Sequence, residues 1–289
     1  SAAQAAQASP RRVESKTSQE LVPEEVEEEK EEKAGNTAES FQSVKRKVRN
    51  KLRTFILGNP GVGKSALLNT LMGEVRFRSG FDLGTGLTVK AEKVEFGDVE
   101  YVDLPGLADV IMRELACVEI YEVLSAGGQV KLLFAITLSA HGHVRAQDLA
   151  TIELILDAFP KFVTENCAFG IIVNKVPENL AIPENMVLTL HVHDEDIPRD
   201  KVTILCVRVQ EGLTDQPNQL LKLPDPVREK IERMPCVEVE GKDVREIRPY
   251  KFEELLRNCE ERLRDLRQEQ DQWQKKVEDL KQLSDWEEE

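Results

Sequence analysis

The sequence predicts an α/β fold of three layers, in which helices cover both faces of a mainly parallel β-sheet. Between residues 51 and 207, short and almost wholly apolar segments alternate with amphipathic segments of helical period. This alternation is typical of buried parallel strands that are joined by helices. At 289 residues, the chain is also long enough to bury a large hydrophobic core.

The expected elements follow one another in a regular order along the chain. Strands are expected at 51–57, 89–96, 99–103, 131–138, 168–174 and 201–207, and helices at 64–73, 108–125 and 146–159. The first helix ends at Gly73, because glycine readily adopts the left-handed conformation that closes a helix. Residues 176–200 are interpreted as an insertion between two strands.

The two ends of the chain differ in composition from this central part. Residues 1–42 are rich in Ala, Gln, Ser and Glu, and such an acidic tail is expected to be disordered because it buries too little apolar surface to offset its ordering entropy. Residues 43–235 are assigned to one domain, which begins with the basic segment 43–53. Residues 236–289 are assigned to a C-terminal helix.

The C-terminal segment carries the repeat of a long helix or coiled coil. From Phe252 to Leu280, mostly apolar residues recur at alternating spacings of 4 and 3, the seam along which helices pack. The repeat is short and one seam position, Gln270, is polar. Docking on the domain therefore competes with dimerisation as the role of this helix.

Charge and cysteine content limit the classes of partner. The chain has 39 basic and 53 acidic residues, a net charge of −14, which makes nucleic acid an unlikely main partner. The basic segment 43–53 could contact an acidic membrane, but no apolar run of about 18 residues is present to cross one. The five cysteines are widely spaced, as expected of reduced thiols in the cytoplasm.

The clearest motif is GNPGVGKS at residues 58–65, which matches G-x-x-x-x-G-K-[ST] between an expected strand and helix. Its glycines allow backbone N–H groups to point at phosphate oxygens, and the following helix adds its positive N-terminus. Lys64 would neutralise the β- and γ-phosphates and Ser65 would bind Mg²⁺. The motif therefore predicts a P-loop nucleoside triphosphatase domain. The residues expected to hold the nucleotide here are Gly58, Asn59, Pro60, Gly61, Val62, Gly63, Lys64, Ser65 and Ala66.

Two further segments complete the expected site. In VEYVDLPGL (99–107), an apolar strand delivers Asp103, which could hold Mg²⁺ through water, and Gly106, whose N–H could contact the γ-phosphate. The loop before it offers Thr88, or secondly Thr85, as the threonine that closes on Mg²⁺. The predicted metal ligands are thus Ser65, Thr88 and Asp103, and the predicted catalytic residues are Lys64, Thr88 and Gly106.

The order GNPGVGKS, Thr88, DLPGL and VNK (173–175) resembles the GTPase branch of P-loop proteins. FRSGFDLGTGLTVK (77–90) and DLPGLAD (103–109) are most similar to septins and immunity-associated (avirulence-induced-gene type) GTPases. The resemblance covers roughly residues 50–210. It implies a switch that binds GTP or GDP with Mg²⁺, with Asn174 supporting the P-loop and the stem of Lys175 lying over the base.

The sequence departs from this family pattern at two positions. Leu107 stands where many small GTPases carry a water-orienting glutamine, so hydrolysis is expected to be slow unless a dimer supplies a catalytic group. Pro177 stands where the family has the aspartate that reads guanine, and without that carboxylate, base discrimination should shrink. Glu178, one residue further on, is a candidate replacement acceptor.

Other functions remain open at this stage. The chain could be a non-hydrolysing scaffold that presents its C-terminal helix to a second copy or to another protein, or it could bind ATP, since an adenine pocket does not need the missing aspartate. HVHDED (191–196) together with HGH (141–143) contains zinc-ligand residue types. No fixed ligand spacing supports a metal site, however, and exposed loop histidines are the preferred interpretation.

Overall fold

The structure is a computed structural model. The residues that it describes are 51–80, 88, 90–178, 180, 189–193, 195–210 and 218–287. They all belong to one compact unit of the chain, Lys47–Glu289. The expectations for the acidic tail, for most of the basic segment and for Thr85 lie outside the described residues.

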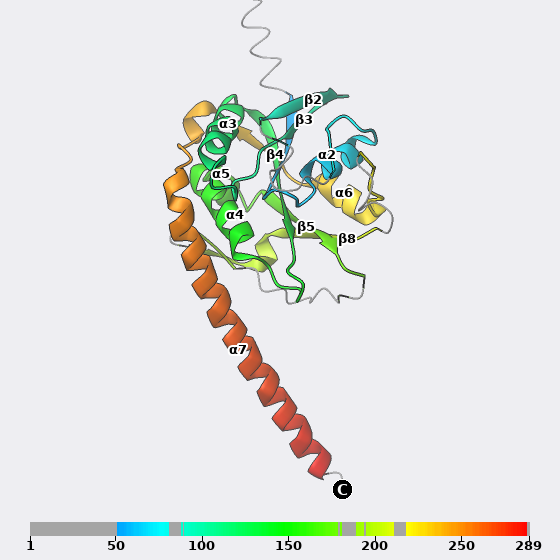
Figure 1. The fold of residues 1–289 in the computed structure, drawn as a ribbon, viewed down its shortest axis with the longest axis vertical. Coiled ribbons are helices and arrows are strands. Elements are labelled where there is room, and N and C mark those ends of the chain that lie inside the picture. The colour runs from blue at the N-terminus through cyan, green and yellow to red at the C-terminus, as the bar shows by residue number, and fades with distance from the viewer. Residues whose placement is uncertain are drawn as a thin grey trace, which may run out of the picture. The chain divides into compact units, whose positions relative to one another are not determined.

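The sheet confirms the mainly parallel architecture that the sequence predicts. Its path runs β2-β3-β1-β4-β5-β8, and every neighbouring pair on it is parallel except the edge pair β2 and β3 (Figure 1). A short strand, β9, pairs antiparallel with the first residues of β4, where β5 does not reach. The strands are β1 (Leu52–Leu57), β2 (Glu92–Phe96), β3 (Val99–Asp103), β4 (Gly128–Thr137), β5 (Phe169–Val176), β8 (Thr203–Arg208) and β9 (Val237–Val239).

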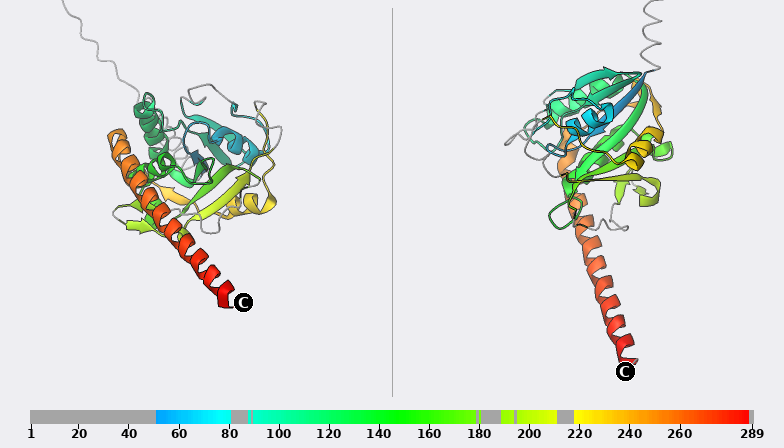
Figure 2. Two further views of the ribbon diagram at one scale, coloured as in Figure 1. Left: turned by 60° about the horizontal axis from the view of Figure 1, so that its bottom comes forward. Right: turned by 90° about the vertical axis from the view of Figure 1, so that its right-hand side faces the viewer.

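Helices cover both faces of this sheet. Figures 1 and 2 show α2 and α6 over one face, and α3, α4, α5 and the first part of α7 over the other. The helices are α2 (Lys64–Met72), α3 (Arg113–Ser125), α4 (Ala146–Ala158), α5 (Lys161–Thr164), α6 (Asp225–Arg233) and α7 (Phe252–Glu287), with short 3₁₀ turns at Arg199–Lys201, Gly241–Asp243 and Pro249–Lys251. The fold therefore has three layers.

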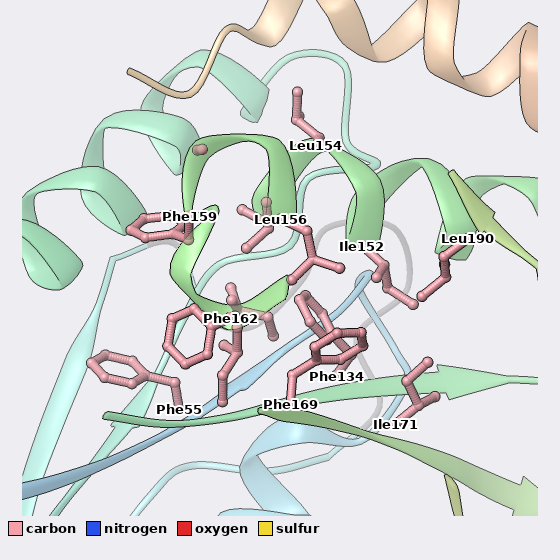
Figure 3. Close-up of a cluster of buried hydrophobic side chains, with 14 of the residues drawn as sticks. Phe55, Phe134, Ile152, Leu154, Leu156, Phe159, Phe162, Phe169, Ile171 and Leu190 are labelled. Atoms are coloured by element: carbon pink, nitrogen blue, oxygen red, sulfur yellow. The ribbon is translucent and has the colours of Figure 1, made fainter. Parts of the chain in front are cut away.

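Two hydrophobic clusters lie on opposite faces of the sheet. The larger one joins the sheet to α3, α4, α5 and α7, and the rings of Phe134 and Phe169 meet edge to face in it, with centroids 5.9 Å apart (Figure 3). The smaller one packs Leu67 and Leu68 of α2 and Ile231 of α6 against Ile56 of β1. The sheet is thus buried on both faces, which explains why its strands are almost continuously apolar.

Several boundaries differ from those predicted from the sequence. Helix α3 begins at Arg113 rather than at residue 108, because Asp109 Oδ1 accepts hydrogen bonds from the backbone N–H groups of Ile111 and Met112 in a turn before the helix. The insertion at 176–200 contains an antiparallel hairpin of β6 (Leu190–Val192) and β7 (Glu195–Ile197).

The C-terminal segment begins differently from the prediction as well. Residues 237–239, which were assigned to that segment, form strand β9 of the sheet, and α7 begins only at Phe252. Helix α6 was not predicted either. Pro224 and Pro226 lie at its start, and proline is common at the first positions of helices.

Helix α7 is docked on the domain only over its first part. Phe252, Cys259 and Leu263 are buried against the larger cluster, and α7 lies beside α4. Beyond this part, Trp273 and Val277 are 58% and 49% exposed. In the part of the chain that the structure describes, no helix combines the length and apolarity needed to cross a membrane.

Candidate nucleotide-binding site

The P-loop joins the end of β1 to the start of α2 and requires glycine at two positions. A Cβ atom at Gly58 would lie 2.2 Å from the carbonyl oxygen of Ala135 on β4. Gly63, which caps α2 with φ 94°, would bring a Cβ atom within 2.6 Å of Asn174 Nδ2. The loop can therefore pass this close to two neighbouring strands only because both residues lack side chains.

Lys64 lies buried at the beginning of α2. Only 7% of the residue is exposed, and its ammonium donates a hydrogen bond of 3.3 Å to the carbonyl oxygen of Asn59. Burial lowers the pKa of Lys64, while the charge of Asp103 acts in the opposite direction. An anionic phosphate in the loop would supply the strong partner that a buried ammonium favours.

The structure brings the three predicted metal ligands together. Asp103 ends β3, opposite Ile56 of β1, and its Oδ2 atom accepts hydrogen bonds from Ser65 Oγ at 2.6 Å and Thr88 Oγ1 at 2.9 Å. Burial raises the pKa of Asp103, against the lowering effects of Lys64, both hydroxyls and the N–H of Leu104. Asp103 Oδ1 is buried without a hydrogen-bond partner among the described residues.

This donor set fits Mg²⁺, a hard cation that prefers carboxylate, hydroxyl and water oxygens. The unpartnered Oδ1 atom gives an independent sign of fit, because a buried carboxylate oxygen normally has a partner. Ser65, Thr88 and Asp103 are thus the residues that would hold the ion, directly or through its water.

Gly106, which the sequence predicts to contact the γ-phosphate, lies against the P-loop. A Cβ atom at this position would lie 2.5 Å from Pro60 Cδ and 2.7 Å from Pro60 N. The absence of a side chain therefore allows the segment after β3 to approach the P-loop closely.

The predicted base-binding residues hold the P-loop from its other side. Asn174 Nδ2 donates to the carbonyl oxygen of Val62 at 2.8 Å, and Lys175 Nζ donates to that of Gly61 at 2.7 Å. Lys175 takes φ 58°, a left-handed conformation that is uncommon for a residue with a side chain. Asn174 therefore supports the P-loop through its hydrogen bond to Val62.

Pro177 begins a tight turn that the sequence did not predict. The N–H of Leu180 donates to the Pro177 carbonyl at 3.1 Å, and one guanidinium nitrogen of Arg208 donates to the carbonyls of Pro177, Glu178 and Leu180. The Glu178 residue is exposed. Arg208 thus fixes the backbone of the segment where the family pattern places its base-reading aspartate.

Comparison with known proteins places this geometry in a family. A family model described as 50S ribosome-binding GTPase matches residues 53–175, which include the P-loop, Asp103 and Asn174. The matched residues have the P-loop GTPase fold.

The chain also matches several solved structures at low sequence identity. Toc33 from Arabidopsis thaliana in complex with Mg²⁺ and GMPPNP is 17% identical with a TM-score of 0.40, covering 70% of this chain and 93% of that one. NFeoB from S. thermophilus bound to GDP·AlF₄⁻ and K⁺ is 15% identical with a TM-score of 0.37, covering 68% and 65%. No curated protein matches this chain.

Leu107 of the GTPase domain does not point into the nucleotide site. Its side chain is 1% exposed and belongs to the larger hydrophobic cluster, and its carbonyl oxygen accepts a hydrogen bond of 2.8 Å from Arg113 Nε. An apolar side chain in the core cannot orient an attacking water.

The two histidines of the hairpin formed by β6 and β7 each lie beside a carboxylate. His191 Nδ1 lies 3.0 Å from Asp196 Oδ1, and His193 Nδ1 lies 3.4 Å from Asp157 Oδ1. Within the residues that the structure describes, no group of three or more His, Cys, Asp or Glu side chains is placed to hold a metal ion.

Proposed function

We propose that the protein binds guanine nucleotides with Mg²⁺ and hydrolyses GTP slowly, acting as a nucleotide switch. The observation that carries this proposal is the meeting of Ser65, Thr88 and Asp103 beside the P-loop lysine, Lys64. These groups come from α2, the loop before β2 and the end of β3. Their convergence on one carboxylate oxygen supports a common ligand.

Each part of the site has a distinct role in this proposal. The backbone N–H groups of the P-loop hold the phosphates, and Lys64 neutralises their charge. The N–H of Gly106 contacts the γ-phosphate, and Thr88 closes over it. Bound Mg²⁺ would supply charge neutralisation between the β- and γ-phosphates. Loss of the γ-phosphate releases Thr88 and Gly106, which gives the two states of the switch.

For the base, we propose that Asn174 and Lys175 frame a guanine pocket that discriminates less strictly than one that contains the aspartate. Proline has no side-chain acceptor for guanine, so Pro177 cannot supply the two hydrogen bonds of an aspartate. Glu178 is exposed and adjacent in the turn that Arg208 holds, and we propose its carboxylate as the replacement acceptor. On this basis, Glu178→Gln lowers the preference for GTP over ATP.

Slow hydrolysis follows from the burial of Leu107, and a second copy of the chain is the proposed source of a catalytic group. The segment after Gly106 and the start of α3 expose Val110, Ile111, Leu115 and Val118 by 72%, 88%, 58% and 54%. Such an exposed apolar group of residues favours association with another protein surface. The wide spacing of the five cysteines supports the proposed location in the reducing cytoplasm.

Equilibrium binding of labelled GTP with Mg²⁺ tests the nucleotide site. The unmodified protein is expected to bind GTP. Lys64→Ala is expected to bind it at least about 100-fold more weakly, because the charged hydrogen bond from the ammonium to the phosphates is lost. Equal binding by both proteins would exclude the P-loop as the site.

The same preparation distinguishes the alternatives. The buried Leu107 favours a non-hydrolysing scaffold. If the unmodified protein releases more phosphate from GTP than Lys64→Ala does, this alternative is excluded. Displacement of labelled GTP by a hundredfold excess of ATP would indicate an adenine-binding protein. Little displacement is the result expected for a guanine site.

A further inference from the structure

Asn59, the second residue of the P-loop, has its side chain held at both ends by helix α4. Its Nδ2 atom donates to Asp148 Oδ1 at 2.6 Å, and its Oδ1 atom accepts from Thr151 Oγ1 at 2.8 Å. Asn59 is 6% exposed, Asp148 3% and Thr151 1%. The orientation of this amide is therefore fixed inside the protein, on the side of the loop away from solvent.

Asp148 also ties the P-loop to the sheet. Its second oxygen, Oδ2, accepts from the backbone N–H of Thr137 at 3.4 Å. Thr137 ends β4 and lies opposite Asn174 of β5, the residue that supports the loop at Val62. The P-loop is thus held by α4 through Asn59 and by β5 through Asn174.

The contact reaches Lys64 through the backbone of Asn59. The carbonyl oxygen of Asn59 accepts the hydrogen bond from Lys64 Nζ at 3.3 Å, and it also accepts from the N–H of Val62 at 3.4 Å. Rotation of Asn59 would therefore move the carbonyl to which the ammonium is bound. The side chain of Asp148 is hydrogen-bonded directly to Asn59 and is therefore two hydrogen bonds away from Lys64.

A carboxylate in this place is unfavourable for folding, which argues for a role in the site. No salt bridge joins Asp148 to a basic side chain in the described part of the chain. Burial raises the pKa of Asp148 to about 6, against the lowering effects of Asn59, the Thr137 N–H and the charge of Arg145. Groups that are destabilised by their surroundings in this way are concentrated at functional sites.

We propose that Asp148 is a positioning residue of the nucleotide site: it fixes Asn59, and through Asn59 it holds Lys64 and the P-loop in the conformation that receives phosphates. This inference rests on the proposed function, since it concerns the same site. Asp148 itself touches no phosphate in this arrangement; it acts through Asn59.

A double-mutant cycle for binding of labelled GDP with Mg²⁺ tests this relationship. Asp148→Ala and Asn59→Ala are each expected to weaken binding about 10-fold, the size of one lost hydrogen bond to a charged group. The double variant is expected to bind no more than about twofold weaker than Asn59→Ala, because Asp148 then has nothing left to position. If the two losses multiply, Asp148 acts by another route and the inference is overturned.

The control variant is Asp157→Asn, on the same helix α4. Asp157 pairs with Lys251 at 3.0 Å and with His193, so its replacement tests whether any change on α4 disturbs binding. It is expected to leave GDP affinity unchanged. A loss equal to that of Asp148→Ala would overturn the inference in favour of a general effect of helix stability.

If Asp148→Ala does not fold, Thr151→Val gives the same test from the other end of the amide. It keeps the volume of the side chain and removes only the hydroxyl that donates to Asn59 Oδ1, with an expected loss of about threefold or more in GDP affinity. Unchanged affinity would contradict the inference. If Lys64→Ala also bound as well as the unmodified protein, the proposed function itself would fail, so the two failures are distinguishable.

The pH profile supplies a readout that a purely structural role would not move. Arg145 is the charged side chain that acts on Asp148, while the groups that meet its oxygens from the P-loop and from β4, Asn59 Nδ2 and the Thr137 N–H, are both donors. Protonation therefore weakens at least one of these contacts, because the hydroxyl oxygen of a carboxyl group is a poorer acceptor than a carboxylate oxygen. The ratio of GDP affinities of the unmodified protein and Asp148→Asn, in which titration of the nucleotide cancels, is expected to fall about threefold or more from pH 7 to pH 5. A constant ratio would overturn the inference.

Discussion

Ser65 Oγ donates a hydrogen bond of 2.6 Å to Asp103 Oδ2, across 38 residues of sequence. The other oxygen of that carboxylate, Oδ1, is buried and unpartnered among the described residues. The hydroxyl and the carboxylate that we propose as Mg²⁺ ligands are therefore adjacent in the folded protein.

The first prediction concerns the metal. Chelation of Mg²⁺ is expected to weaken GDP binding by the unmodified protein about 10-fold or more, whereas Ser65→Ala should bind weakly and respond little to chelation. Titration of labelled GDP with and without EDTA measures both. Ser125→Ala is the matched control, since Ser125 Oγ is buried without a partner in the described structure; equal EDTA responses of Ser65→Ala and the control would contradict the prediction.

The second prediction concerns Arg113, which joins the segment after Gly106 to the start of α7. Its Nε atom donates to the Leu107 carbonyl at 2.8 Å, its NH1 atom contacts Glu253 at 2.7 Å, and its guanidinium lies 4.0 Å from the centre of the Phe252 ring. Arg113→Met is expected to lower the free energy of unfolding by about 1.5–3 kcal/mol, because a buried carbonyl loses a charged donor.

Glu253→Gln is the companion variant for Arg113. The Glu253 side chain is 59% exposed, so its ion pair should contribute less than about 1 kcal/mol. Urea unfolding of both variants compares them directly. A larger loss for Glu253→Gln than for Arg113→Met would show that the ion pair, and not the Leu107 contact, stabilises this junction.

The third prediction concerns the seat of α7 on α4. Glu153 of α4 has a side chain that is 1% exposed, and it accepts hydrogen bonds from Arg262 and Cys259 of α7 and from the N–H of His191. Burial raises the pKa of Glu153, and the charge of Arg262 opposes that rise. Arg262→Met therefore leaves a buried carboxylate without its cation and is expected to destabilise the protein by about 3–5 kcal/mol at pH 7.

This loss should be largely recovered in the double variant Glu153→Gln/Arg262→Met, which removes both charges. It should also shrink as the pH is lowered, because protonation of Glu153 neutralises the unpaired group. Urea unfolding at pH 5 and pH 7 gives both comparisons. A double variant as unstable as Arg262→Met would refute the view that the unpaired charge causes the loss.

The fourth prediction is a pH dependence of stability that arises from Asp148. Its pKa is raised from 3.8 to about 6 in the folded protein, so the folded state binds the proton more tightly than the unfolded state. The corresponding stability is present below pH 3.8 and is lost as the pH rises through about 6. At about 1.4 kcal/mol per pKa unit, the loss is about 3 kcal/mol.

The difference in unfolding free energy between the unmodified protein and Asp148→Asn isolates this effect from the other carboxylates. It is expected to change by about 2.4 kcal/mol between pH 4 and pH 7, with the unmodified protein losing stability relative to the variant. A difference that does not vary with pH would show that Asp148 keeps an ordinary pKa.

Local spacing made much of the fold and site predictable. The glycines, lysine and serine that a P-loop requires lie close together in the sequence. The consecutive residues GNPGVGKS were therefore enough to predict it. Asp103 and Asn174 could be expected because they lie at or near the carboxyl ends of β3 and β5, and the ends of parallel strands meet at one edge of the sheet.

The remaining features depend on contacts between distant residues. Asp148 reaches Asn59 across 89 residues and Arg208 reaches Pro177 across 31, and neither has a neighbouring motif that would single it out. Strand β9 is three residues long and owes its conformation to pairing with β4. The later start of α3 reflects the Asp109 turn, in which a side chain competes with the helix for backbone N–H groups.

The burial of Leu107 has a consequence for timing. A GTPase domain that orients its own attacking water sets its own rate of GTP hydrolysis. A domain whose corresponding side chain is buried in the core, as Leu107 is, cannot do so by this route. We expect the lifetime of the GTP state here to be set from outside, by the arrival of a surface that completes the site.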